Sequence, residues 1–79
     1  MLPLGNHLQV AALRKQFGQR LRSIRTQRRM TQERFAETLE ISVDFLSLME
    51  RGRSAPSFET HERISKRLRM AVAELFNFD

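Results

Sequence analysis

Positive charge gathers in the first part of this chain. Seven basic residues and no acidic residue occur from Met1 to Gln32, whereas seven basic residues face nine acidic ones from Glu33 onward. Guanidinium and ammonium groups clustered in one segment are suited to binding phosphate. The clustering therefore predicts an anionic partner, although a solvated helix face explains any single one of these charges equally well. The seven are Arg14, Lys15, Arg20, Arg22, Arg25, Arg28 and Arg29.

Other site chemistry has little support in the sequence. The chain has no cysteine, and its two histidines, His7 and His61, are too far apart to form a metal-ligand pattern. Neither a nucleophile paired with a base nor a glycine-rich phosphate loop is evident, so we expect no enzyme activity, no cofactor and no small-molecule ligand. Apolar runs are too short to cross a bilayer, and no Trp or Tyr is available for a membrane surface, so a cytoplasmic protein is expected.

Two short amphipathic helices are predicted between Thr31 and Arg53. Apolar residues recur at helical spacing in each, as Phe35, Ala36 and Leu39 and then as Phe45, Leu46 and Met49. Thr31 and Ser42 stand immediately before these stripes, where a hydroxyl can accept a hydrogen bond from a free helix amide. Two helices joined by so tight a turn are typical of DNA-docking units.

The rest of the chain also has helical periodicity, which predicts an all-α fold. Leu13, Phe17, Leu21 and Ile24 form one stripe, and Phe58, Ile64 and Leu68 are expected to point inward from a later helix. The predicted helices cover about residues 9–28, 32–39, 43–51, 58–68 and 72–76. Residues 1–8 contain Pro3 and Gly5 and are expected to form a flexible arm, which leaves residues 9–79 as one domain.

The order of these segments resembles the Cro/repressor-type helix-turn-helix family, the xenobiotic-response-element class of bacterial and phage regulators. The resemblance rests on LRSIR (21–25), TQERFAETL (31–39), ISVDFLSLMERGR (41–53), PSFET (56–60) and AELF (73–76). It implies a five-helix, lambda-repressor-like DNA-binding domain whose second and third helices form the helix-turn-helix.

The resemblance also implies which residues would contact DNA. In this family the third helix enters the major groove, so Val43, Asp44 and Leu48, with Ser47 nearby, would read the bases. Val43 and Leu48 can offer apolar contact to a thymine methyl, and Asp44 can accept from cytosine, although an acid here also suits the helix dipole without DNA. The expected phosphate contacts are Gln32, Arg51, Arg53, Ser42 and Arg28.

Several positions match or depart from the family pattern. Arg25 and Glu50 match a pair that forms a buried salt bridge in relatives, where its role is structural. Glu40 and Arg69 occupy turns where glycine is common, His61 takes the place of a core leucine, and Ala71 replaces a polar helix cap.

The predicted function is sequence-specific regulation of transcription by a homodimer on a pseudo-palindromic operator, as in phage Cro-like repressors or restriction-modification controllers. An antitoxin that represses its own operon, or a protein-interaction module that retains the fold, are the alternatives. The dimer is expected to form through Val72, Leu75, Phe76 and Phe78, because the short last helix cannot bury so much apolar surface alone. Leu75 and Phe76 could instead complete the core of one subunit.

Overall fold

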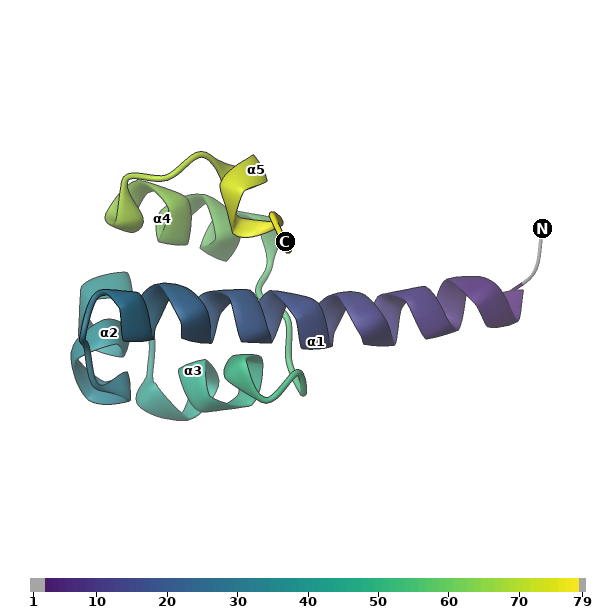
Figure 1. The fold of residues 1–79 in the computed structure, drawn as a ribbon, viewed down its shortest axis with the longest axis horizontal. Coiled ribbons are helices and arrows are strands. Elements are labelled where there is room, and N and C mark those ends of the chain that lie inside the picture. Colours follow the sequence, from purple (N-terminus) through teal and green to yellow (C-terminus); the bar gives the residue numbers. More distant parts are fainter. Residues whose placement is uncertain (1–2, 79) are drawn as a thin grey trace.

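The computed structural model describes residues 3–78, and the described chain folds into helices joined by short turns, without a strand. The helices are α1 (Pro3–Gln27), α2 (Gln32–Leu39), α3 (Val43–Glu50), α4 (Phe58–Leu68) and α5 (Val72–Leu75). Figure 1 shows α1 as the axis of the molecule, with α3 on one side and α4 and α5 on the other. This arrangement confirms the all-α, lambda-repressor-like fold predicted from the sequence.

One hydrophobic core joins all five helices. Phe17, Leu21 and Ile24 of α1 are buried in it, as the stripe along this helix predicts. The helix-turn-helix pair and the two C-terminal helices supply the remaining core residues: Phe35, Ala36, Leu39, Leu46, Met49, Ile64, Leu68 and Leu75. Because every helix contributes, the position of α3 is fixed by the packing of the whole domain.

Hydroxyl caps set the starts of the three middle helices. The hydroxyl oxygen of Thr31 accepts from the amide of Arg34 at 3.1 Å, and that of Ser42 accepts from Phe45 at 3.0 Å. Ser57 caps α4 in the same way. Ala71 has no such side chain, and at α5 the Glu74 carboxylate reaches back to accept from the Ala71 amide at 2.7 Å. That contact compensates for the missing polar cap.

The first helix is longer than the sequence predicts. It begins at Pro3 and not near residue 9, so most of the expected N-terminal arm is helical, while residues 1 and 2 lie outside the described part of the chain. Its N-terminal half projects beyond the other helices (Figure 1). Leu13, expected in the core, is therefore 48% exposed because no other helix packs over it.

A glycine allows α1 and α3 to approach each other closely. Gly18 is buried, and a Cβ atom built there would lie 2.2 Å from the carbonyl oxygen of Met49 and 2.9 Å from that of Glu50. Any larger residue would push the C-terminal end of α3 away from α1. The sequence analysis did not single out Gly18, although a lone glycine inside a helical stripe is a signal of close packing.

Within residues 3–78, three residues other than glycine adopt the left-handed backbone conformation. Glu40 ends α2 with φ 60°, Arg69 ends α4 with φ 57°, and Arg29 has φ 57° in the turn after α1. The first two are the positions at which the family resemblance implies glycine. Glu40 and Arg69 therefore adopt a conformation that glycine favours, at some conformational cost for residues that carry a Cβ atom.

Phe58 was expected to point inward from α4, and the structure shows this to be wrong. It is the first residue of α4, directly after the Ser57 cap, and it is 92% exposed. Ile64 and Leu68 do lie in the core.

No described helix is long and apolar enough to span a membrane.

Candidate nucleic-acid interface

The outer surface of α3 carries the residues predicted to read bases. Val43 and Leu48 are 39% and 37% exposed, Asp44 is exposed, and Ser47 is half-buried. The opposite surface of the helix buries Leu46, Met49 and Glu50 against the core. The structure thus brings the predicted readers together on one solvent-facing side of a capped helix.

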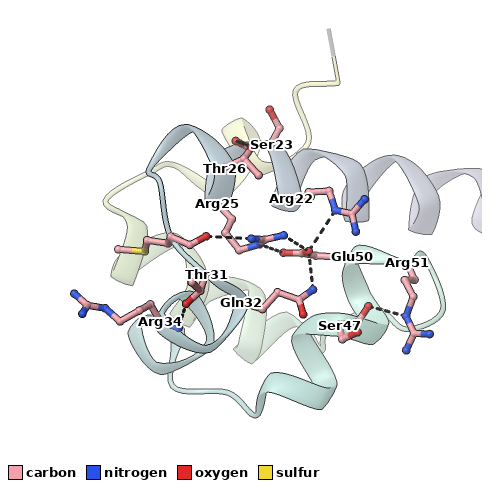
Figure 2. A network of polar contacts seen from close by, with 11 residues as sticks. Arg22, Ser23, Arg25, Thr26, Thr31, Gln32, Arg34, Ser47, Glu50 and Arg51 are labelled. Carbon is pink, nitrogen blue, oxygen red and sulfur yellow. Dashed lines mark hydrogen bonds and ion pairs between the residues drawn. The ribbon is translucent and has the colours of Figure 1, made fainter.

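Glu50 is the centre of a polar network that joins α1, α2 and α3 (Figure 2). Arg25 donates to both carboxylate oxygens, from Nε to Oε2 at 2.7 Å and from Nη2 to Oε1 at 3.0 Å. Its Nη1 donates to the carbonyl of Met30 at 3.0 Å. The structure therefore brings Arg25 and Glu50 together as the resemblance implied, in a two-pronged pair that fixes α3 against α1.

The network keeps Glu50 ionised although its side chain is fully buried. Burial alone would raise the pKa of the Glu50 carboxyl, but the hydrogen bonds from Arg25 and Gln32 outweigh burial and hold that pKa below its ordinary value. The hydrogen bond to Glu50 likewise raises the pKa of Arg25. Both charges are therefore permanent parts of the fold near neutral pH.

Gln32 belongs to the same network. Its Nε2 donates to Oε1 of Glu50 at 3.0 Å, and the residue is half-buried at the first position of α2. Arg22 of α1 approaches the same oxygen, with its Nε 3.5 Å away and its side chain 57% exposed. The sequence analysis named Arg22 only as a member of the basic segment and did not link it to Glu50, although it lies three residues before Arg25 and so shares a face of α1.

The loop after α3 places two further arginines at the surface. Arg51 and Arg53 are exposed, and the Nε of Arg51 donates to the carbonyl of Ser47 at 3.3 Å. Gly52 between them has φ 74°, and a Cβ atom there would lie 2.9 Å from the Cα of Lys15. The loop therefore packs directly on α1, which brings Lys15 close to this pair of arginines.

Other members of the basic segment stabilise helix ends. Arg28, expected at phosphate, donates from Nη2 to the carbonyl of Leu68 at the end of α4, 2.9 Å away. Arg20 donates to the carbonyl of Glu74 at 3.1 Å. Cations suit helix C-termini, where carbonyl groups lack partners. Part of the positive charge in the N-terminal segment is therefore structural, and Ser42 likewise serves as the cap of α3.

The residues predicted for a dimer contact are divided by the structure. Leu75 is fully buried and completes the core, so it cannot contact a partner. Val72 and Phe76 are 42% and 41% exposed, and Phe78 is half-buried. The Phe76 ring packs near Phe17, Phe78 and His61, with centroids 5.5, 6.1 and 5.1 Å away.

A groove of about 350 Å³ opens between α4 and α5 beside these residues. It is lined by Phe58, Glu59, His61, Glu62, Val72 and Phe76.

Burial lowers the pKa of His61, whose Nδ1 is buried without a hydrogen-bond partner among the described residues. No group of three metal-ligating side chains occurs within residues 3–78. We refer to Phe58, Val72 and Phe76 as the apolar rim.

Comparisons with known proteins agree with this geometry. A family model described as a helix-turn-helix domain matches residues 16–76. The chain is 36% identical over 58 residues to the immunity repressor protein of Bacillus phage phi105, and it spans only 40% of that repressor's length.

Two solved structures extend the comparison. The restriction-modification controller protein C.AhdI from Aeromonas hydrophila superimposes with a TM-score of 0.76 at 31% identity, covering 82% of this chain and 98% of the controller. The clp gene regulator ClgR from C. glutamicum gives 0.70 at 35% identity, covering 80% of this chain and 82% of ClgR.

Proposed function

We propose that this chain, which belongs to the Cro/repressor-type helix-turn-helix family, is a double-stranded DNA-binding regulator of transcription. The observation that carries the proposal is the solvent-facing side of α3, a capped helix held rigidly by the Glu50 network and bordered by basic side chains. A helix presented in this way fits the major groove of B-DNA. In this role the protein would act in the cytoplasm.

The basic side chains are better suited to contact the DNA phosphate backbone than the exposed residues of α3 are to contact base edges. Arg51 and Arg53 are exposed beside α3, and the half-buried Gln32 stands at the start of α2, so these residues could hold phosphates of the DNA backbone. Val43 and Leu48 offer only apolar contact, and Asp44 accepts but cannot donate. We therefore infer that much of the affinity comes from the backbone, with a modest contribution from direct readout.

Binding to DNA can be tested with duplexes that the protein selects from a random-sequence pool. With about 4–8 phosphate contacts in a dimer, log K plotted against log salt should slope at about −4 to −7. Equal affinity for every duplex, or no response to salt, would exclude this function. The second outcome would favour a protein-interaction module instead, for which the exposed apolar pair Val43 and Leu48 is the supporting observation.

We further propose that the regulator acts as a homodimer that pairs through the C-terminal surface. The apolar rim supports this, because Phe58, Val72 and Phe76 expose large hydrophobic side chains around one groove. Phe78, half-buried beside Phe76, would extend the contact. Two-fold pairing would place the two α3 helices about 34 Å apart, one turn of B-DNA.

Two valines of similar exposure provide a matched test. Val72 on the rim is 42% exposed and Val43 on α3 is 39% exposed, so neither is needed for the core. Val72→Glu should give a folded monomer in sedimentation that binds the selected duplex poorly. Val43→Glu should remain a dimer and yet lose duplex preference. If Val72→Glu stayed dimeric, pairing would have to use a different surface.

A further inference from the structure

The side of α1 that packs on α5 continues beyond the domain without a partner helix. Phe17 is buried on this side, and the centroid of its ring lies 5.5 Å from that of Phe76 at the end of α5. Leu13 precedes Phe17 by four residues and Val10 precedes it by seven, so the three side chains follow one side of the helix. Leu13 and Val10 are each 48% exposed, because this part of α1 projects past the other helices (Figure 1).

This uncovered stripe adjoins the groove between α4 and α5. Phe76, which packs near Phe17, is also part of the apolar rim, so the stripe and the rim are neighbouring parts of one exposed apolar surface. Adjoining apolar surfaces of this kind are typically covered by another protein. Because α1 is one uninterrupted helix from Pro3 to Gln27, its N-terminal half cannot fold back over the groove of its own chain.

The apolar rim alone is too small for a stable dimer. Stable interfaces cover about 800 Å² on each partner, and a fully covered aromatic side chain contributes only about 150–250 Å². The exposed parts of Phe58, Val72 and Phe76 therefore fall short of the area that is needed. Residues 3–16 of α1 would add a helix side roughly 20 Å long, at about 1.5 Å per residue.

The charges on the two surfaces are complementary. Residues 1–13 contain no Lys, Arg, Asp or Glu, and Arg14 follows directly. Glu59 and Glu62 line the groove beside the apolar rim. All three charged side chains are exposed, and none of them has an ion-pair partner within residues 3–78. A helix that is apolar at Leu13 and positive at Arg14 thus matches a groove that is apolar and negative, whereas the phosphates of a nucleic acid would be repelled there.

We propose that the projecting half of α1 in one copy of this chain docks against the apolar rim of a second copy, and that the exchange is reciprocal. We call Val10, Leu13 and Arg14 the α1 arm. Val10 and Leu13 cover the rim of the partner subunit, and Arg14 lies near its Glu59 and Glu62. A two-fold axis makes both contacts identical.

The α1 arm rests on the proposed homodimer and names the segment that completes its interface. The family model matches residues 16–76, and all three residues of the arm precede residue 16. The helix-turn-helix domain alone therefore does not contain this contact.

Sedimentation of full-length variants without DNA tests the arm. Leu13→Glu should raise the dissociation constant of the dimer about 100-fold or more, because each dimer loses two leucine contacts and places two charges against the rim. Ala12→Glu is the matched control, since Ala12 is exposed one position earlier and about 100° away around the helix. It should change the dissociation constant less than about threefold. Both variants should still unfold cooperatively on heating, because neither residue belongs to the core.

A charge exchange tests whether Arg14 faces the acidic side chains of the groove. Arg14→Glu should weaken the dimer about tenfold at low salt, because it replaces attraction with repulsion in both halves of the interface. Glu62→Arg should weaken the dimer similarly. Combining the two substitutions should restore most of the affinity, and no recovery would show that Arg14 does not face this groove.

Disulfide cross-linking reports the contact directly, because the chain has no cysteine of its own. Leu13→Cys mixed with Val72→Cys should form a disulfide-linked heterodimer, which is identified by its mass. Ala12→Cys mixed with Val72→Cys should not, since Ala12 points away from the rim of the partner subunit in this arrangement.

The outcomes separate the arm from the wider proposals. If the wild-type protein remains monomeric at high concentration, the homodimer fails and the arm fails with it, while DNA binding is judged separately by the duplex titration. If wild type is a dimer but Leu13→Glu dissociates no more than Ala12→Glu, only the arm is overturned. Cross-linking of Val72→Cys copies to one another, but not to Leu13→Cys, would also overturn it, because the α5 surfaces would then pair without the arm.

Discussion

The two sides of α1 differ in how completely they are packed. On the side of α3, Gly18 allows α1 and α3 to approach each other closely. There the buried carboxylate of Glu50 accepts hydrogen bonds from Arg25 of α1 and from Gln32 of α2. On the side of α4 and α5, a groove remains open, Phe58 is 92% exposed, and the Nδ1 of His61 is buried without a partner among the described residues.

This difference indicates separate tasks for the two sides. A completed polar network leaves little freedom for α3, which suits a helix that must present a fixed surface to a rigid duplex. An open apolar groove is poorly satisfied within one chain and suits a surface that a second copy covers. Substitutions that disturb the packed α3 side should therefore destabilise the fold, whereas replacing His61 on the open side, whose buried Nδ1 lacks a partner within residues 3–78, should stabilise it.

The largest loss should follow Glu50→Ala. It leaves Arg25 largely buried without its counter-ion, so the free energy of unfolding should fall by about 3–5 kcal/mol in a urea titration. Because the pKa of Glu50 is lowered in the fold, its contribution is present above about pH 4.3 and is lost as pH falls through the folded pKa.

A double variant is the control for this loss. Arg25→Met combined with Glu50→Leu removes both buried charges and should recover most of the stability. If Glu50→Ala cost less than about 1 kcal/mol, the network would not be what fixes α3, and the contrast between the two sides would fail.

Gly18→Ala should also destabilise the α3 side, by about 1–3 kcal/mol. The new Cβ atom would lie 2.2 Å from the backbone carbonyl of Met49, and backbone cannot move aside as a flexible side chain can. Helix propensity alone would favour alanine by about 1 kcal/mol. The difference in unfolding free energy between Gln19→Ala and Gln19→Gly measures this helix-propensity contribution, because Gln19 is exposed on the same helix. A stabilised Gly18→Ala would show that α1 and α3 are not in close contact.

On the other side, His61→Leu should increase stability by about 1 kcal/mol at pH 7. It removes a buried nitrogen without a partner, a gain partly offset by the lost ring contacts with Phe17 and Phe76.

The effect of His61→Leu should also depend on pH. Because burial lowers the pKa of His61, the unfolded chain binds this proton more readily than the folded chain. Wild-type stability is therefore complete above about pH 6.5 and declines as pH falls through the lower folded pKa. Urea titrations between pH 7.5 and about 5.5 should show this decline in wild type and a flatter profile in His61→Leu. Equal slopes would mean that His61 titrates as in the unfolded chain.

Local sequence signals were sufficient for much of this fold. The predicted ranges 32–39 and 58–68 coincide with α2 and α4, because hydroxyl caps and apolar stripes lie within a few residues of each other. The same signals located the buried stripe of α3, which includes Leu46 and Met49, whereas the residues predicted to read bases came from the family resemblance. The pairing of Arg25 with Glu50 came from the family resemblance, since their separation of 25 residues has no local pattern.

What the sequence could not provide depends on contacts between distant elements. Arg28 was predicted to contact phosphate, and nothing in the sequence indicated its hydrogen bond to a carbonyl 40 residues away that only the folded chain brings near. Phe58 follows the apolar spacing of α4 yet lies in its first turn, beyond the region that the core covers. Arg22 belonged to the basic segment in the sequence, but only the folded chain brings it to Glu50, the residue that Gln32 also contacts.

The smallest predicted effect concerns one turn on each side of the molecule. Glu40 and Arg69 end α2 and α4 with almost the same left-handed geometry, φ 60° and ψ 43° against φ 57° and ψ 43°. A residue with a Cβ atom costs about 1 kcal/mol or more in this conformation, and glycine avoids that cost but loses more entropy on folding. Arg69→Gly should therefore raise the free energy of unfolding by about 0.5–1 kcal/mol.

Glu40→Gly should gain less than Arg69→Gly, because it also removes an ion pair. Its carboxylate lies 3.9 Å from Arg67, but both side chains are about half exposed, so the pair contributes only about 0–1 kcal/mol. Arg69→Ala is the control, since it removes the same charge and keeps the Cβ atom, and it should gain nothing. If Arg69→Ala and Arg69→Gly had the same free energy of unfolding in urea, the gain would result from loss of the Arg69 charge. Backbone strain would then not explain the effect of either glycine substitution.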